Sequence, residues 1–298
     1  MPHKTPLRYP GGKQRLAPFI LEILETNGLL GGDYVEPYAG GAGVAIELLL
    51  ENNVRRVHLN DSCRSIYAFW KAILTKTDEF CRRIRTVPLT VTEWRRQREI
   101  LSRPDEFDDL ELGFSTFYLN RCNRSGILVG SGLIGGLKQS GEWKMDARFP
   151  REGLAKRVEA IAARKTSISL RQMDAEDFIL GYVSDLPKRT LVYCDPPYFQ
   201  KAQRLYFDHY APDDHARIAS VIQRKIKHPW IVSYDNAPAI LQSYLARRSF
   251  NYEWQYNAAS CRKGTEVFFF SDNLKLPRVS GLACINVALT RERSGILD

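Results

Sequence analysis

Four adjacent residues, Asp195, Pro196, Pro197 and Tyr198, combine groups that suit the chemistry of an aromatic amine. Such an amine is a poor nucleophile because its lone pair is conjugated into the ring, so a catalyst gains most by holding hydrogen-bond acceptors against its hydrogens. The Asp195 carboxylate and the Pro196 carbonyl would supply two acceptors, and the Tyr198 ring would stack on the base. The prolines hold φ at about −65° and restrict the residues before them, so the loop would meet a ligand already shaped. A strand followed by an ordinary proline-rich turn is the alternative interpretation.

A glycine-rich turn at residues 39–43 follows a strand-like run at 34–38 and precedes a helical pattern. Small residues let the backbone approach a ligand, and the following helix would point its N-terminus at it. The turn does not complete the G-x-G-x-x-G pattern of dinucleotide-binding folds, which disfavours a nicotinamide or flavin enzyme. Asp61 ends the next strand-like run, a position from which a carboxylate accepts hydrogen bonds from ribose hydroxyls. A helix N-cap at Asp61 or Ser62 explains the same residues equally well.

A loop near the N-terminus, Tyr9-Pro10-Gly11-Gly12-Lys13, precedes another helical pattern. Its glycines would let the backbone come close to a ligand, and Lys13 could face a carboxylate or a phosphate. Pro-Gly-Gly is first of all a loop signal, so the motif alone decides nothing. The chain has no G-x-x-x-x-G-K-[ST] motif, and nothing in it indicates ATP hydrolysis at a P-loop.

The charge of the chain favours a polyanionic partner. Its 298 residues carry 43 Lys and Arg against 34 Asp and Glu, a formal net charge of +9 at pH 7. An excess of this size is common in proteins that bind nucleic acid, although other basic proteins bind none. Arginines cluster at 82–85, 95–98 and 247–248, where solvated helix faces are the alternative explanation.

The cysteines and the apolar runs predict a cytoplasmic protein. Six scattered cysteines form no C-x-x-C pair and match no histidine spacing, so we expect neither a zinc site nor a disulfide framework. Residues 1–8 are polar, and no apolar run approaches the ~20 residues that span a bilayer. Secretion and membrane insertion are therefore not expected.

The apolar pattern predicts alternating strands and helices, and hence an α/β fold with a mainly parallel sheet covered on both faces. The rhythm stops near residue 75 and resumes after residue 150, and the segment between them is rich in Arg, aromatic residues and Gly, as an insertion would be. We expect strands at 34–38, 54–59, 168–173, 191–194 and 230–234, helices at 16–30, 44–50, 66–74, 211–226 and 237–246, and a closing strand pair at 253–258 and 266–270. An apolar run at 282–289 has no assignment.

Taken in order, these motifs resemble those of one family, the Dam-like, D12 class of DNA adenine-N6 methyltransferases. The resemblance covers most of residues 5–271, and such an ordered set is far more specific than any single motif. The matching stretches are RYPGGK at 8–13, VEPYAGGAG at 35–43, LND at 59–61, Asp177-Phe178, DPPY at 195–198, FYLNRCNRSG at 117–126 with IGG at 134–136, SYDN at 233–236 and RKGTE at 262–266. Where members often have Asp-Pro-Phe, this chain has Glu36-Pro37-Tyr38, which keeps the charge and the aromatic ring.

The resemblance implies a Rossmann-like S-adenosylmethionine-dependent methyltransferase sheet, formed by residues 1–74 and 156–298, with an inserted, mainly helical target recognition domain at 75–155. It also implies methyl transfer from S-adenosylmethionine to N6 of an adenine flipped out of double-stranded DNA, with no metal required. Asp195 would orient the amine and take up its developing positive charge, with Pro196, Pro197 and Tyr198 beside it. The residues that the resemblance places at the cofactor are Tyr9, Gly12, Lys13, Glu36, Tyr38, Gly40, Gly43, Asp61 at the ribose, Asp177 and Phe178 at the adenine ring, and Asp195.

Double-stranded DNA is the partner that the resemblance implies, and it would associate the protein with the nucleoid. A cognate restriction endonuclease acting separately is the further partner of a restriction-modification role. Side chains of the insert would touch phosphates and base edges. The candidates are Arg95, Arg96, Arg121, Asn123, Arg124 and Lys138.

Three alternatives to an adenine methyltransferase stay open at this point. The acceptor could be cytosine N4 or an amine in RNA, or the chain could be a catalytically silent DNA-binding relative. Asp195 favours adenine, because enzymes acting on cytosine N4 more often carry Ser at that position. The intact DPPY stretch at 195–198 argues against a silent relative.

Overall fold

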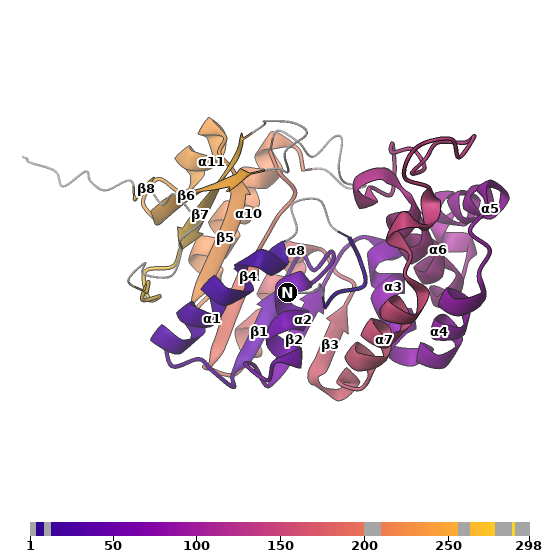
Figure 1. Cartoon of the computed structure of the whole chain (residues 1–298). Helices are drawn as coiled ribbons and strands as arrows, with labels where there is room; N and C mark the ends of the chain where they lie inside the picture. Colours follow the sequence, from indigo (N-terminus) through magenta and orange to yellow (C-terminus); the bar gives the residue numbers. More distant parts are fainter. Residues whose placement is uncertain (1–3, 9–12, 200–209, 256–262, 278–287, 290–298) are drawn as a thin grey trace, which may run out of the picture.

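The computed structural model of the chain describes residues 4–8, 13–199, 210–255, 263–277 and 288–289, and centres on one sheet (Figure 1). Its strand order is β3 (Ile168–Arg171), β2 (Arg56–Asn60), β1 (Asp33–Glu36), β4 (Thr190–Cys194), β5 (Trp230–Asp235), β7 (Lys263–Phe270), β6 (Arg248–Gln255) and β8 (Ala288–Leu289). The strands from β3 to β5 run parallel, whereas β7 is antiparallel to both β5 and β6. The predicted α/β sheet with a closing strand pair is therefore confirmed.

The order of the parallel strands reverses at β1, which lies between β2 and β4. In open α/β sheets the ligand crevice forms at such a switch point, outside the carboxyl ends of the strands. Glu36 ends β1 and is followed by the glycine turn, while Cys194 ends β4 and is followed by Asp195. The topology therefore brings the two strongest sequence motifs to the same edge of the sheet.

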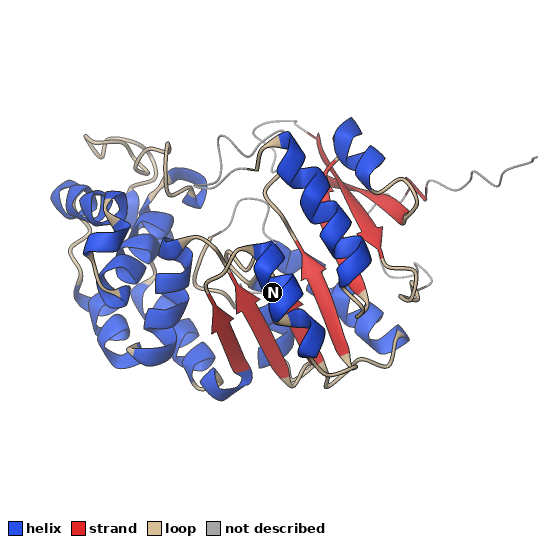
Figure 2. Ribbon diagram, turned by 180° about the vertical axis from the view of Figure 1, so that it is seen from behind, coloured by secondary structure: helices blue, strands red, loops and turns tan. Residues whose placement is uncertain are grey.

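The buried side chains of the strands alternate between two apolar layers, because successive residues of a strand face opposite sides. Tyr34, Leu191 and Phe268 belong to one layer, and their neighbours Val35 and Val192 belong to the other. The first layer packs against α1 (Ala17–Thr26) and α2 (Gly43–Leu50), and the second against α8 (Ala175–Gly181), α10 (Pro212–Lys225) and α11 (Pro238–Ser243), which Figure 2 shows from behind. Among the helices of the described residues, none is long and apolar enough to cross a membrane.

Residues 64–162 form a helical body beside β3, the edge strand of the sheet (Figure 1). Gly113 lets two of its helices approach closely, because a Cβ at this position would lie 2.5 Å from the carbonyl oxygen of Ala68. The apolar cluster of the insert, including Phe80 and Phe117, is continuous with the first layer of the sheet. The helices of this body are α3 (Arg64–Thr75), α4 (Thr77–Thr86), α5 (Val91–Ser102), α6 (Asp109–Cys122) and α7 (Arg151–Ala162), with 3-10 turns at Pro104–Glu106, Arg124–Gly126 and Met145–Arg148. The predicted boundaries at 75 and 155 fall at the end of α3 and inside α7.

Element boundaries differ from the sequence predictions where side chains in distant segments take part. The expected helix at 16–30 begins instead as a 3-10 turn, η1 (Lys13–Leu16). Helix α1 ends at Thr26, where Asn27 caps it, as the stop signal Asn27-Gly28 in the sequence predicts. Strand β6 starts at Arg248, earlier than expected, because the Arg248 guanidinium donates to the carbonyls of Ser271 and Leu274. Of the unassigned run at 282–289, only β8 lies within the described residues, where it pairs with β6.

Candidate active site

Asp195 lies at the centre of a polar cluster built from four separate elements. Its Oδ1 atom accepts a hydrogen bond of 2.6 Å from the Ser233 hydroxyl of β5 and lies 3.2 Å from the Lys13 ammonium of η1. The same ammonium donates to Oε2 of Glu266, on β7, at 2.6 Å. The Tyr193 hydroxyl of β4 completes the cluster at 2.8 Å from Ser233. The fold therefore gathers one cation and two carboxylates at the carboxyl end of β4.

The loop after Asp195 is fixed by side chains of β5, β7 and η1. The Tyr198 hydroxyl donates to Oε1 of Glu266, and the Lys13 ammonium lies 5.3 Å from the centre of the Tyr198 ring. The backbone N–H of Phe199 donates to Oδ1 of Asp235 at 2.8 Å. Tyr198 is 7% exposed. These contacts, with the two prolines, give the loop a defined shape at the edge of the sheet.

Together, burial and the charges within the cluster raise the pKa values of Asp195, Lys13 and Glu36 above their usual values. Burial raises the pKa of Asp195, and the Lys13 charge offsets only part of that rise. Burial lowers the pKa of Lys13, but the charges of Asp195, Tyr193 and Glu266 outweigh it, so this pKa lies well above its usual value. Burial also raises the pKa of Glu36 to about 8. The carboxylates that face Lys13 within the described residues are those of Asp195 and Glu266.

The glycine turn after β1 is shaped by the residues that sequence analysis assigned to the cofactor. Glu36 is buried and accepts a hydrogen bond of 3.1 Å from the N–H of Ala45, in the first turn of α2. Gly40 has a φ of +46°, and its N–H donates to Oδ2 of Asp61 at 2.8 Å. A Cβ at Gly43 would lie 3.2 Å from Cβ of Gln14. The turn therefore joins the ends of β1 and β2 to the start of α2, with little room for a larger residue at Gly43.

Asp61 takes part in the local backbone structure as well as lying at the expected ribose position. Its Oδ1 accepts from the N–H of Cys63 at 3.0 Å, just before α3 begins, and its Oδ2 accepts from Gly40. Cys63 is the N-cap residue of α3, so neither Asp61 nor Ser62 is the cap in the strict sense. The carboxylate thus orders the loops that follow β1 and β2, and ribose binding stays a prediction.

Tyr38, another expected cofactor residue, faces the second layer of the sheet. Its hydroxyl is 3.0 Å from the hydroxyl of Tyr210, and the two rings meet edge to face. Tyr210 also packs edge-on against His215 of α10. The contact joins the loop after β1 to the residues that precede α10.

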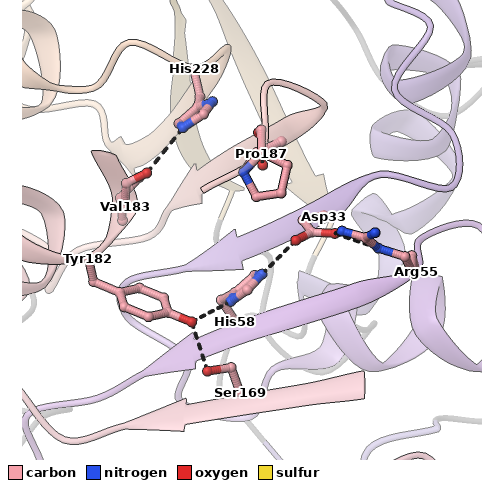
Figure 3. Close-up of polar contacts among 9 residues, drawn as sticks. Asp33, Arg55, His58, Ser169, Tyr182, Val183, Pro187 and His228 are labelled. Carbon is pink, nitrogen blue, oxygen red and sulfur yellow. Dashed lines mark hydrogen bonds and ion pairs between the residues drawn. The ribbon is translucent and has the colours of Figure 1, made fainter. Parts of the chain in front are cut away.

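Asp177 and Phe178, expected at the adenine ring, occupy different environments on α8. Asp177 is exposed, whereas Phe178 is fully buried and stacks on Tyr182 with ring centres 5.1 Å apart. The Tyr182 hydroxyl is in turn 2.8 Å from Nδ1 of His58 and 2.9 Å from the Ser169 hydroxyl (Figure 3). A role at the adenine ring stays a prediction for both residues, and the structure adds a polar network behind Phe178.

The polar network behind Phe178 begins at the amino end of β1. His58 lies between Tyr182 and Asp33, with its Nε2 atom 3.1 Å from Oδ2 of Asp33, and Arg55 binds the other oxygen of Asp33 (Figure 3). Burial lowers the pKa of His58 although Asp33 acts against it. The network ties β1, β2 and β3 together beneath α8, which supports the position of Phe178.

Two of the expected DNA-binding residues lie inside the protein. Arg121 is 7% exposed and donates to the backbone carbonyls of Arg148 and Pro6. Asn123 is 1% exposed, accepts from the Trp94 indole and donates to the carbonyl of Ile127. Both side chains therefore order the insert. Arg95, Arg96, Arg124 and Lys138 are exposed and remain available to a ligand.

Tyr9 and Gly12 lie outside the described residues, as does Arg262 of the RKGTE stretch. Sequence reasoning assigned no role to Ser233, Asp235 or Glu266, although all three fall in motifs that carried the resemblance. The signal that could have found them is the polar residue in an otherwise apolar strand, such as Glu266 before the run Val267 to Phe270.

The groups at the switch point fit the S-adenosylmethionine that the sequence predicts. Asp61 places a carboxylate with about four acceptor sites at the end of β2, where ribose hydroxyls bind in such sheets. Among the residues that the structure describes, the carboxylates of Asp195 and Glu266 outnumber the one cation that they contact, Lys13, so this part of the cluster has a negative balance that suits a sulfonium. Gly40 and Gly43 allow the backbone to approach a ligand.

The chain is similar to known methyltransferases. A family model described as D12 class N6 adenine-specific DNA methyltransferase matches residues 9–258. A search of curated proteins finds no match. Among solved structures, the chain is similar to a protein of Legionella pneumophila (9% identity, covering 90% of this chain and 86% of that chain, TM-score 0.39), an rRNA methyltransferase of Streptomyces viridochromogenes (15%, 89% and 88%, 0.38) and a putative methyltransferase of Escherichia coli (8%, 86% and 86%, 0.35). Similarities this distant say nothing about the substrate of this chain.

The family model spans the parallel sheet, the insert and the Asp195 loop, which is most of the chain. The order of the motifs and the geometry at the switch point agree with that match. The chain therefore belongs to the D12 class of N6 adenine-specific DNA methyltransferases, and S-adenosylmethionine is its cofactor.

Proposed function

We propose that this chain is a site-specific DNA methyltransferase that transfers a methyl group to N6 of an adenine flipped out of double-stranded DNA. The observation that carries the proposal is the Asp195 carboxylate, held at the switch point of the sheet with the Tyr198 ring on the same loop. Bound S-adenosylmethionine supplies an activated methyl group, so the share of the protein is positioning and electrostatics.

Asp195 has one oxygen placed to accept from the amine. Within the described residues, both polar contacts of its carboxylate fall on Oδ1, from Ser233 and Lys13. Oδ2 is then the acceptor for one N–H of the adenine, and the Pro196 carbonyl is the acceptor for the other. The carboxylate also stabilises the positive charge that develops on N6 as the methyl group arrives.

The amine of a paired adenine is unreachable inside the base stack, so the base must be rotated out of the duplex. We expect the extruded base to stack on the Tyr198 ring, which would offset part of the cost of unpairing. Pro196 and Pro197 reduce the freedom of the loop, so little ordering remains to be done when the base enters.

Positive charge on the insert supports DNA as the acceptor. The segment that joins α6 to the turn Met145–Arg148 lies on the side to which the parallel strands point (Figure 1). It carries the exposed cations Arg124, Lys138 and Lys144, together with Trp143, which is 64% exposed. Cations of this kind bind phosphates, and an exposed aromatic ring can contact bases.

A cluster of arginines at the end of α6 adds to the positive electrostatic potential of the insert. Burial, and then the charges of Arg8, Arg157 and Arg148, lower the pKa of Arg121 to about 9. In the described part of the chain, no salt bridge pairs any of these four arginines with a carboxylate. A concentration of unneutralised positive charge favours a polyanion at the adjoining surface.

Mass spectrometry of the nucleosides formed from labelled S-adenosylmethionine tests the proposed function. Mixed-sequence double-stranded DNA is expected to yield N6-methyladenine, and methylation-sensitive long-read sequencing would then report the recognised sequence. N4-methylcytosine, methylation of RNA alone, or DNA binding without any transfer by folded protein would each overturn the proposal. Association with the nucleoid and pairing with a restriction endonuclease remain predictions that depend on its outcome.

Asp61→Asn is expected to weaken cofactor binding by ~10-fold or more, because a hydrogen bond to a charged group contributes about 1.5–3 kcal/mol. Asparagine keeps the size of the side chain and an acceptor for the N–H of Cys63, but its amide NH2 replaces the oxygen that accepts from the N–H of Gly40. Calorimetric titration with S-adenosylmethionine measures the change, and Asp105→Asn, at an exposed position of the insert, is the matched control. An unchanged Kd in the Asp61 variant would show that this carboxylate only orders the loops.

Lys138→Ala is expected to weaken DNA binding equally on all sequences and to reduce the slope of log K against log salt by about 0.9, the loss of one phosphate contact. Fluorescence anisotropy over a salt series measures both quantities. Lys165→Ala removes the same charge at an exposed position next to the amino end of β3, away from the proposed DNA surface, and should leave the slope unchanged. Equal effects of the two variants would mean that only net charge matters.

A further inference from the structure

Glu266 is a buried carboxylate in a strand whose following residues are apolar, and packing of the core does not explain it. It is 6% exposed and is followed in β7 by four apolar residues. Its strand partner across the sheet is Asp235, itself 4% exposed, so two buried carboxylates face each other in register. Like charges directly opposite in a sheet are destabilising, and a buried carboxylate is costly unless it is paired and hydrogen-bonded.

The two oxygens of Glu266 have different partners, and both partners belong to the site. Oε1 accepts from the Tyr198 hydroxyl, and Oε2 accepts from the Lys13 ammonium at 2.6 Å. Lys13 also faces the Tyr198 ring and lies 3.2 Å from Asp195. The side chain thus connects the ring of the loop to the cation that neutralises the central carboxylate.

We infer that Glu266 is a positioning residue for methyl transfer, which fixes the plane of the Tyr198 ring through one oxygen and holds Lys13 away from full pairing with Asp195 through the other. This inference rests on the proposed function, since it assigns a task to a residue of the same site. Glu266 does not touch the reacting atoms. Its effect passes through Tyr198 and Lys13.

The first task concerns the ring on which a base would stack. A tyrosine ring in a loop can turn about its side-chain bonds, and a hydrogen bond at its far end removes that freedom. Glu266 supplies this bond from a strand, which is more rigid than the loop that carries Tyr198. A base entering the site therefore meets a ring that is already oriented.

The second task concerns the charge on Asp195. Lys13 is shared between two carboxylates, and its distance to Glu266 is shorter than its distance to Asp195. Burial raises the pKa of Asp195, Lys13 lowers it, and the Glu266 charge raises it again. Removing the Glu266 charge would therefore lower the pKa of Asp195. Within the described ranges, the other groups that face Asp195 are Glu36 and Tyr34 of β1, Tyr193 and Cys194 of β4, and Ser233 of β5.

Glu266→Gln and Glu266→Ala separate the two tasks in the full chain. Glutamine keeps an acceptor for the Tyr198 hydroxyl and loses the charge, so the single-turnover rate at neutral pH should fall by no more than a few-fold. The acid limb of its pH–rate profile should move to lower pH, because Asp195 stays ionised further into acid. Alanine loses both contacts, and its rate should fall by ~10-fold or more with the Kd for DNA little changed.

Tyr198→Phe checks that the loss in Glu266→Ala runs through the hydroxyl. In that background Glu266→Ala should cost clearly less than it does in the parent, because the partner of Oε1 is already gone. Glu159→Gln makes the same chemical change on α7, where the side chain is 46% exposed and pairs with Arg85, and should change neither rate nor profile. Two results would overturn the inference and leave Glu266 a structural residue. One is that the rate losses of Tyr198→Phe and Glu266→Ala simply add, and the other is that the acid limb of the pH–rate profile does not move in Glu266→Gln.

The pH dependence of cofactor binding distinguishes a failed inference from a failed function. Calorimetry with S-adenosylmethionine needs no turnover, and protonation of Asp195 should weaken binding of the sulfonium. Glu266→Gln should move that weakening to lower pH even if the parent transfers no methyl group to DNA. If the Kd for S-adenosylmethionine depended on pH in the same way in parent and variant, the inference would be wrong, whatever acceptor the parent methylates.

Discussion

Asp195→Ala is expected to abolish methyl transfer while leaving most of the affinity for DNA. Removal of one preorganised polar group that stabilises a developing charge costs ~100–1,000-fold in rate, and here the acceptor for the amine is lost as well. DNA affinity should persist if the proposed phosphate contacts of the insert, away from Asp195, dominate binding. Single-turnover transfer from labelled S-adenosylmethionine and anisotropy at a fixed salt concentration measure the two quantities on the same preparation.

Two further variants make the Asp195 result specific. Asp195→Asn keeps the shape and one oxygen, so its rate should lie between those of the parent and the alanine variant. Asp185→Ala removes an exposed carboxylate from the turn Val183–Asp185, ahead of the amino end of β4, and should behave as the parent. DNA affinity that fell as far as activity in Asp195→Ala would mean that the site and the DNA-binding insert cannot be separated.

Gly113→Ala is expected to destabilise the fold, because a Cβ at this position meets backbone atoms that cannot turn away. It would lie 2.5 Å from the carbonyl oxygen of Ala68, 2.7 Å from its carbonyl carbon and 2.9 Å from Cα of Phe69. Relief requires α6 to move from α3, and overpacking of this kind costs ~1–3 kcal/mol or more. The helix propensity of alanine, about 1 kcal/mol better than that of glycine, acts in the opposite direction and offsets only part of the loss.

Gly153→Ala provides the matched control for Gly113→Ala. Gly153 also lies in a helix, α7, but a Cβ there has no neighbour within 4 Å. The free energy of unfolding should therefore stay the same or rise by up to ~1 kcal/mol. Urea denaturation measures both variants. Equal free energies of unfolding for the two would mean that α3 and α6 adjust to the added methyl group without cost.

The sheet could be predicted because its signals are local. The runs 34–38, 191–194 and 230–234 are short, apolar and followed by turn residues, and each forms a strand buried on both faces. The glycine turn and the asparagine at the end of the first helix are likewise signals read within a few residues. Boundaries were less accurate where distant partners decide them, as when Arg248 extends β6 by binding carbonyls near residue 274.

The candidate site could be predicted only in part. Motifs identified Asp195, Tyr198 and Lys13, but the spacing of residues contains no information about which oxygen meets which donor. Arg121 illustrates the opposite error, since an arginine in a basic insert suggests a surface contact, whereas the fold buries it against backbone carbonyls. Exposure depends on how α6 packs, and that packing depends on residues far away in the chain.

The sequence by itself determined the family, the alternation of strands and helices, and the residues able to hold an amine, because these follow from residue type and order. Only the tertiary structure decided that Lys13 and Glu266, 253 positions apart, share an ion pair beside Asp195. It did so because the strand order reverses at β1 and β7 returns antiparallel to β5, which brings the ends of distant segments to one edge of the sheet. The residue types therefore determine which chemistry the site can perform, whereas the topology of the sheet determines its charge balance.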